Sequence, residues 1–122
     1  MKKFLVLFLF STLFAIEVKE AVICKRISNR LPQEIDSVFV SGIGELICWC
    51  NLKIESPDTI YHEWIYKDSV MAKIKLPINF ASENYRVWSK KRIFSLWIGE
   101  WKVRIKDKKD SLLKEINFKI VE

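Results

Sequence analysis

Apolar and polar residues alternate along much of this 122-residue chain, so its dominant pattern has a period of two. The alternation is clearest where Trp101, Val103 and Ile105 lie on one side and charged residues lie on the other. A period of two indicates a β-strand with one buried face and one solvated face. The pattern, together with short apolar runs, predicts strands at 21–27, 37–40, 46–54, 59–66, 69–78, 100–105 and 113–121.

The segments between these predicted strands carry turn residues, and no stretch has the period of 3.6 that an amphipathic helix requires. Residues 46–54 are apolar on both faces, which is typical of a central strand covered on both sides. Residues 79–84 are expected to form an irregular connection. Seven to eight short strands predict an all-β fold, an antiparallel β-sandwich of immunoglobulin-like architecture.

The N-terminus has the composition of a secretory signal. Lys2 and Lys3 precede an apolar run over residues 4–16, which is shorter than the roughly 20 residues of a membrane-spanning helix. We therefore expect a signal helix over residues 1–15, followed by a single β-sandwich domain over residues 16–122. The alternative is an uncleaved membrane anchor. Either case predicts a periplasmic or extracellular protein that meets the membrane only through this segment.

The net charge narrows the class of partner. The chain has a formal net charge of +6. Removal of residues 1–15 would take away Lys2 and Lys3 and leave a net charge of 6 − 2 = +4. Nucleic acid is not expected outside the cytoplasm, so the predicted partner is an unknown protein or an anionic envelope polymer. The alternative is that the charge only aids solubility.

Three cysteines would enter an oxidising compartment, where disulfides are permitted. Cys48 and Cys50 share one face of a strand, with Cβ atoms roughly 6.5 Å apart at a rise of ~3.3 Å per residue. A disulfide requires the two Cβ atoms to lie about 3.5–4.5 Å apart. We therefore expect Cys24 to pair with either Cys48 or Cys50, which leaves one thiol free.

Several short motifs occur in an order that resembles one bacterial family. They are Asn29-Arg30-x-Pro32, His62-x-Trp64, Arg86-x-Trp88-Ser89-x-Lys91, Trp97-x-Gly99-x-Trp101 and a final strand that holds Phe118. The chain resembles domain-of-unknown-function family 2914. The resemblance implies a small extracytoplasmic all-β domain, and it supplies no activity. Where the family often has glycine in the turn near Asp107, this chain has Asp110, which leaves the turn type open.

The residues that could support catalysis or bind a metal do not form a recognised arrangement. His62 is the single histidine, and Cys-x-Cys on a flat strand is expected to direct the two sulfurs apart. We therefore predict no metal, no cofactor and no catalytic residue. We interpret His62 as a residue at the edge of the core, beside Trp64, that hydrogen-bonds across the two sheets or to an indole. The predicted structural residues are Trp49, His62, Trp64, Trp101 and Phe118.

The densest positive charge surrounds two of the tryptophans. An indole among cations suits an acidic ligand through stacking and charge, although Trp88 could instead pack inward below solvated basic neighbours. The predicted binding residues are Arg86, Trp88, Ser89, Lys90, Lys91, Arg92 and Trp97. The sequence thus predicts a non-catalytic binding domain. The alternatives are a structural accessory that pairs through a sheet edge and, more remotely, a metal-binding or enzymatic domain.

Overall fold

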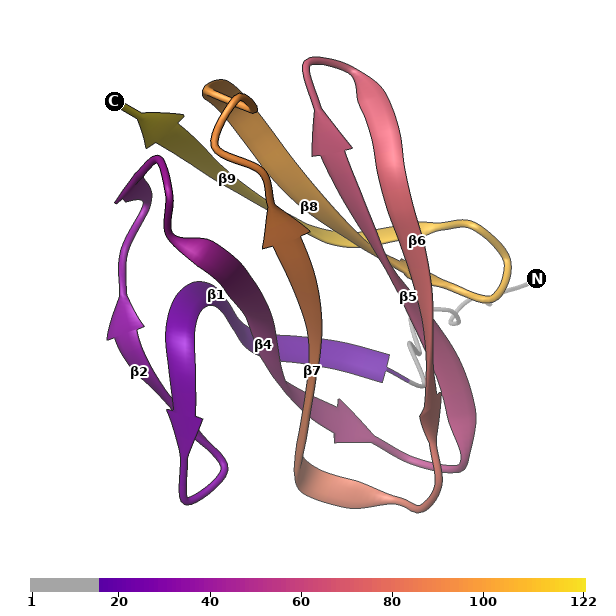
Figure 1. The fold of residues 1–122 in the computed structure, drawn as a ribbon. Coiled ribbons are helices and arrows are strands. Elements are labelled where there is room, and N and C mark those ends of the chain that lie inside the picture. Colours follow the sequence, from indigo (N-terminus) through magenta and orange to yellow (C-terminus); the bar gives the residue numbers. More distant parts are fainter. Residues whose placement is uncertain (1–15) are drawn as a thin grey trace, which may run out of the picture.

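The alternating pattern folds into nine β-strands in a computed structural model that describes residues 16–122 (Figure 1). The predicted signal helix falls on residues 1–15, outside the described residues. No helix in the described part of the chain is long and apolar enough to cross a membrane. The strands are β1 (Ile16–Ser28), β2 (Leu31–Ile35), β3 (Val38–Val40), β4 (Gly44–Ile54), β5 (Asp58–Tyr66), β6 (Ser69–Ile78), β7 (Ser82–Ile93), β8 (Gly99–Asp107) and β9 (Leu112–Val121).

The strands form two sheets. One has the order β2-β1-β4-β7, and the other has the order β3-β9-β8-β5-β6. All pairings are antiparallel except β3 with β9, which is parallel. The prediction of an all-β fold is confirmed. The strand number is higher than the predicted seven to eight, and the parallel pair corrects the expectation of an entirely antiparallel arrangement.

The additional strands arise where the sequence pattern is weakest. β2 has no fully buried residue, so it shows no apolar alternation. β7 begins at Ser82, which makes the predicted irregular connection over 79–84 shorter than expected. The residues of β7 alternate between a basic outer side and an inner side that includes the buried Ser89. Such a strand shows little of the hydrophobic alternation on which a sequence prediction depends.

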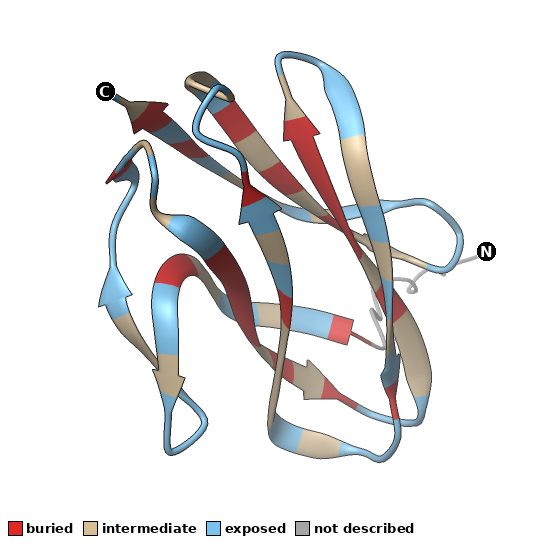
Figure 2. Cartoon of the chain, viewed as in Figure 1, coloured by how far each residue is buried: buried red, intermediate tan, exposed pale blue. Residues whose placement is uncertain are grey.

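The core lies between the facing sides of the two sheets. Buried residues of both sheets join one cluster, which includes Leu46 and Leu52 from β4 and Trp64, Trp101 and Phe118 from the opposite sheet. Figure 2 shows buried segments on strands of both sheets. Phe118 stacks on Trp101 with ring centroids 5.8 Å apart. Trp64 meets the edge of Phe118 at 6.1 Å.

β4 is buried on both faces, as predicted. Its inward residues join the main core, while Ile47 and Trp49 point to the opposite side. There they form a second, smaller cluster with Cys24 of β1, and Trp88 of β7 packs against it. The Trp49 indole N–H donates to the carbonyl of Arg30 at 3.0 Å, so the β1–β2 turn closes over this outer cluster.

Candidate functional site

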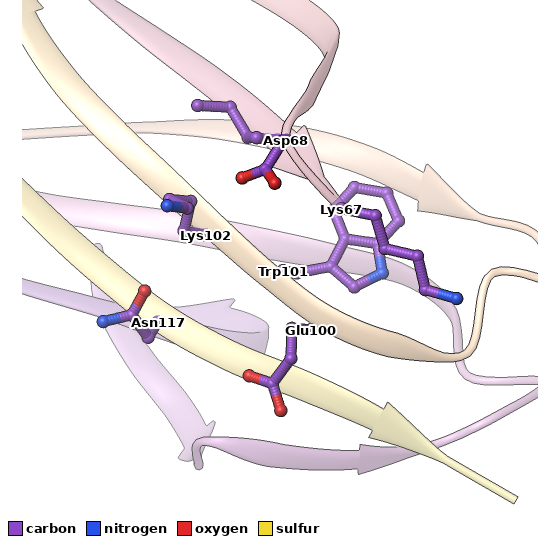
Figure 3. Close-up of a pocket in the computed structure, with 7 residues that line it drawn as sticks. Lys67, Asp68, Glu100, Trp101, Lys102 and Asn117 are labelled. Atoms are coloured by element: carbon purple, nitrogen blue, oxygen red, sulfur yellow. The ribbon is translucent and has the colours of Figure 1, made fainter.

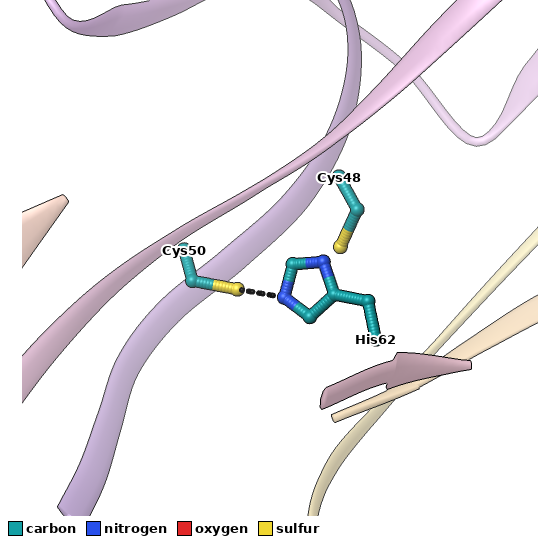
Figure 4. A group of neighbouring side chains, drawn as sticks. All are labelled: Cys48, Cys50 and His62. Carbon is teal, nitrogen blue, oxygen red and sulfur yellow. Dashed lines mark hydrogen bonds between the residues drawn. The ribbon is translucent and has the colours of Figure 1, made fainter. Parts of the chain in front are cut away.

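Two parts of the molecule bring chemically distinctive side chains together. The first is a buried cluster between the sheets, which we call the thiol–imidazole cluster and define as Cys48, Cys50 and His62. Cys48 and Cys50 alternate inward from β4, and His62 points inward from β5 of the other sheet (Figure 4). Their two Sγ atoms and an imidazole nitrogen all lie within 4.8 Å of one another. Cys50 Sγ is 3.3 Å from His62 Nε2.

The other imidazole nitrogen is held by β7. His62 Nδ1 lies 2.6 Å from Ser89 Oγ, and the Trp64 indole N–H donates to the same oxygen at 3.0 Å. A hydroxyl oxygen accepts two hydrogen bonds, so Ser89 can accept from both rings when the imidazole proton is on Nδ1. In that tautomer, the lone pair of Nε2 points to the sulfur side of the cluster.

The two thiols of the cluster have different acidities. The pKa of Cys50 is lowered to about 6, chiefly by its hydrogen bond to the Cys48 thiol. Burial raises the pKa of Cys50, and the charge of His62 and the hydrogen bond to the imidazole lower it further. Burial raises the pKa of Cys48 well above its usual value, and interaction with Cys50 raises it further. Deprotonation of the pair is therefore favoured at Cys50 over Cys48.

The expectation that the two sulfurs point apart is wrong. Both Sγ atoms turn toward the imidazole, since each sulfur lies one bond beyond its Cβ and can rotate toward the opposite sheet (Figure 4). Cys48, Cys50 and His62 are each 0% exposed. The core encloses these side chains, so an organic substrate would reach the thiols only if the fold opened far more than a single ion requires. The donor set of two sulfurs and one nitrogen instead matches the ligands of a soft metal ion.

The predicted disulfide between Cys24 and Cys48 or Cys50 is not formed, and all three cysteines are free thiols. In the β1–β4 register, Cys24 faces Ile47, whereas Cys48 faces Ile23. Cys24 therefore points to the outer side of the sheet, while Cys48 and Cys50 point to the core. A sheet separates the thiols, so this bridge is geometrically excluded.

The second region is the outer side of β7, which we call the basic face and define as Arg86, Trp88, Lys90 and Arg92. These residues alternate along the strand, opposite Asn51, Trp49, Ile47 and Glu45 of β4. Trp88 is half-buried against Trp49. The Arg30 guanidinium lies 5.9 Å from the centre of the Trp88 ring and donates to the carbonyl of Arg86 at 3.4 Å.

Not every predicted binding residue belongs to the basic face. Ser89 is buried in the core, so its predicted place on the surface is wrong. Lys91 also lies on the inner side of β7, and its ammonium sits 4.9 Å from the Trp97 ring centre. Trp97 packs on Trp101, with ring centroids 5.8 Å apart. Sequence reasoning missed the role of Ser89, although its place next to an outward Trp88 signals an inward position on a strand.

The predicted structural residues are buried. Trp49, His62, Trp64, Trp101 and Phe118 are each at most 2% exposed. His62 hydrogen-bonds across the two sheets, as predicted, through Ser89. Its position is deeper than expected, because the imidazole lies in the centre of the core rather than at its edge.

A shallow hollow lies at the β5–β6 turn, beside β8 and β9 (Figure 3). Asp68, Glu100, Lys102 and Asn117 surround it, and their side chains spread around the rim rather than converge on one point. With Lys67, which also lines the hollow, its two acidic and two basic groups balance, and nothing in the arrangement selects a ligand.

The fold and these two regions define a small all-β domain with a buried thiol–imidazole cluster and a basic outer face. Residues 57–120 match the model of the protein family of unknown function DUF2914, and the chain belongs to that family. His62, Trp64 and Ser89, which carry the resemblance in sequence, are joined by hydrogen bonds in the core. Cys48 and Cys50 lie outside the matched residues.

No curated protein matches the chain. Among solved structures, it is similar in fold to the Pseudomonas fluorescens alkylpurine DNA glycosylase AlkC bound to DNA containing an abasic site analog. The TM-score is 0.54 at 9% sequence identity, over 88% of this chain and 31% of that chain. The chain thus spans about a third of the glycosylase's length, and the likeness concerns the fold alone.

Proposed function

We propose that this protein is a non-catalytic β-sandwich domain that binds an anionic polymer of the cell envelope through the basic face. The observation that carries the proposal is the row of Arg86, Lys90 and Arg92 around Trp88 on one side of one strand. No carboxylate among residues 16–122 lies within ion-pair distance of these three cations. Their charge is therefore available to an anionic ligand.

The polar groups next to Trp88 are incompletely hydrogen-bonded within the chain. Arg86 Nε is buried and has no hydrogen-bond partner, and the same holds for Asn51 Oδ1 on the paired position of β4. Buried polar atoms without partners are uncommon, since each costs about 1–3 kcal/mol. Carboxylates and phosphates accept the geometry that a guanidinium offers. An indole beside that guanidinium adds a stacking surface for a sugar ring or a planar group.

The proposed address is the periplasm or the extracellular space, supported by the positively charged and apolar N-terminus of the sequence. The proposed architecture is immunoglobulin-like. Its support is the facing pair of strand orders, β1-β4-β7 against β9-β8-β5-β6, with consecutive strands divided between two sheets. A non-catalytic role is supported by the burial of His62 and of the neighbouring thiols, since this nucleophile–base pair is enclosed in the core.

The test uses the full chain, purified after expression with its N-terminal segment, and intact peptidoglycan sacculi as the probe. Lys90→Ala combined with Arg92→Ala removes two exposed cations from the basic face. The matched control is Lys114→Ala combined with Lys119→Ala, which removes two exposed cations from β9 in the other sheet. We expect co-sedimentation that weakens with salt, is lost in the first variant and is retained in the control.

Equal binding by both double variants would refute the proposal, as would the absence of binding by the unaltered protein. The alternative of pairing through a sheet edge has less support. The edge strand β6 carries exposed Lys73, Lys75 and Pro77, which are residues that oppose strand addition. Self-association that persists in Lys90→Ala/Arg92→Ala would favour that alternative.

A further inference from the structure

The thiol–imidazole cluster is the one group of side chains in residues 16–122 whose donor atoms converge as metal ligands do. We propose that Cys48, Cys50 and His62 bind one Cu(I) ion, through the two Sγ atoms and the imidazole Nε2. This inference is independent of polymer binding by the basic face, because the two regions lie on opposite sides of the β2-β1-β4-β7 sheet.

The spacing of the donor atoms already approaches that of a bound site. Metal–sulfur bonds near 2.3 Å and metal–nitrogen bonds near 2.0 Å place ligand atoms about 3.5–4 Å apart. Cys50 Sγ and His62 Nε2 are 3.3 Å apart, and the whole set falls within 4.8 Å. Side-chain rotation alone can therefore close the ligands around an ion, without movement of β4 or β5.

The imidazole is oriented by a second layer of contacts. Metal-bound histidines usually donate their other ring N–H to a fixed acceptor, which sets the tautomer and the ring angle. Ser89 Oγ provides that acceptor at 2.6 Å from Nδ1. The hydroxyl is held in turn by the Trp64 indole N–H at 3.0 Å. This arrangement leaves Nε2 as the nitrogen that faces the sulfurs.

The donor set selects Cu(I) over Zn(II). A structural zinc site is closed by four ligands, usually in a tetrahedron. The cluster contains three ligand residues, and within the described part of the chain no further Cys, His or carboxylate joins it. Thiolate ligands favour soft ions, and Cu(I) is stable with three ligands in surroundings that exclude water. The side chains around the cluster belong to the hydrophobic core, which meets that requirement.

The test is anaerobic titration of the reduced full chain with Cu(I) buffered by a chromophoric chelator. We expect one equivalent of Cu(I) per chain, and an X-ray absorption spectrum with two sulfur ligands and one nitrogen ligand. Saturation should raise the melting temperature by roughly 10 °C, since the ion binds the preorganised ligands of the folded state more tightly than the unfolded chain. Cys48→Ala combined with Cys50→Ala should lose the bound ion, whereas Cys24→Ala should retain it, because Cys24 lies on the other side of the sheet.

Ser89→Ala keeps all three ligands and removes the group that orients the imidazole. We expect it to weaken Cu(I) binding by roughly 10–100-fold. Circular dichroism of each metal-free variant establishes that it is folded before its affinity is compared. If the cysteine double variant does not fold, Cys50→Ala alone serves the same comparison.

Three outcomes would overturn the proposal. The first is no Cu(I) binding by the unaltered chain. The second is binding that survives the loss of Cys48 and Cys50. The third is a preference for Zn(II) in direct competition, which would show that a fourth ligand closes the site.

Discussion

At the scale of single residues, the serine between Trp88 and Lys90 on β7 has the largest structural effect for its size. Ser89 Oγ satisfies the Trp64 indole N–H and contacts His62 Nδ1, and all three side chains are buried. Removing a buried hydrogen-bond partner is more costly than the bond itself, because the remaining group stays desolvated. The polar core thus depends on one hydroxyl.

We predict that Ser89→Ala lowers the free energy of unfolding by about 2–3 kcal/mol, since it leaves two buried ring nitrogens without their partner. Urea denaturation followed by tryptophan fluorescence measures the change. Ser95→Ala is the matched control, because Ser95 is exposed and should be neutral within about 0.5 kcal/mol. A neutral Ser89→Ala would mean that the His62–Ser89–Trp64 contacts add nothing to stability.

The cysteines give a second prediction at this scale. Alkylation of the denatured chain without reductant should label three thiols, since Cys24 is separated from Cys48 and Cys50 by the sheet itself. Mass spectrometry counts the labels, and a reduced sample gives the reference value. A single labelled thiol would contradict the structure. The sequence could not exclude the bridge, because a β-bulge between Val18 and Glu20 shifts the register that decides which side Cys24 occupies.

At the scale of the strands and turns, the tight turns depend on backbone conformations that most residues avoid. Asn29 and Arg30 both have positive φ, as do Lys67 and Asp68, which is the pattern of two-residue hairpin turns. Asp110 has φ of 67° in the turn between β8 and β9. The sequence left this turn type open, and the structure shows that aspartate adopts the left-handed conformation there.

We predict that Asp110→Gly raises the free energy of unfolding by about 0.5–1 kcal/mol. Glycine relieves the left-handed strain, and the exposed pair between Asp110 and Lys106, at 3.2 Å, contributes less than that relief. Asp110→Ala is the comparison, because it loses the pair and keeps the strain, so it should destabilise. Thermal unfolding distinguishes the two variants. A higher melting temperature for Asp110→Ala than for Asp110→Gly would contradict this account of the turn.

How well the sequence predicts each strand depends on what its two faces contact. β6, β8 and β9 are predicted closely, since each has one face in the core and a largely polar opposite face. β5 is predicted as closely because its core face alternates regularly, although its opposite face includes the buried Ile65. β7 is not, because Trp88 faces outward and Ser89 faces inward, which reverses the polarity expected of a half-buried strand. The sequence therefore predicts a single binding surface, whereas β7 places the predicted binding residues on its two opposite sides.

At the scale of the whole molecule, the site arises from contacts between sheets, which no periodicity records. Cys50 and His62 are close in sequence but lie in different sheets, and Ser89 reaches the same point from β7. The sequence supplies the residue types and the inward direction of alternate positions. The relative placement of the two sheets decides which inward residues meet, and packing of side chains from all the strands determines that placement.

At Trp101 a network of aromatic contacts joins β5, β8 and β9 to the connection between β7 and β8. The Trp101 ring stacks on Phe118 and lies 4.8 Å from the ring centre of Tyr66, and its indole N–H donates to the carbonyl of Trp97 at 3.1 Å. Trp101→Ala should therefore lower the free energy of unfolding by about 3–5 kcal/mol, a large part of the ~5–15 kcal/mol typical of such a domain. Trp101→Phe keeps a ring in the stack and loses the hydrogen bond, so its cost should be smaller. Guanidinium denaturation measures both, with Phe80→Ala as the control because Phe80 is 60% exposed. Equal costs for Trp101→Ala and Phe80→Ala would show that the packing of the two sheets does not depend on this tryptophan.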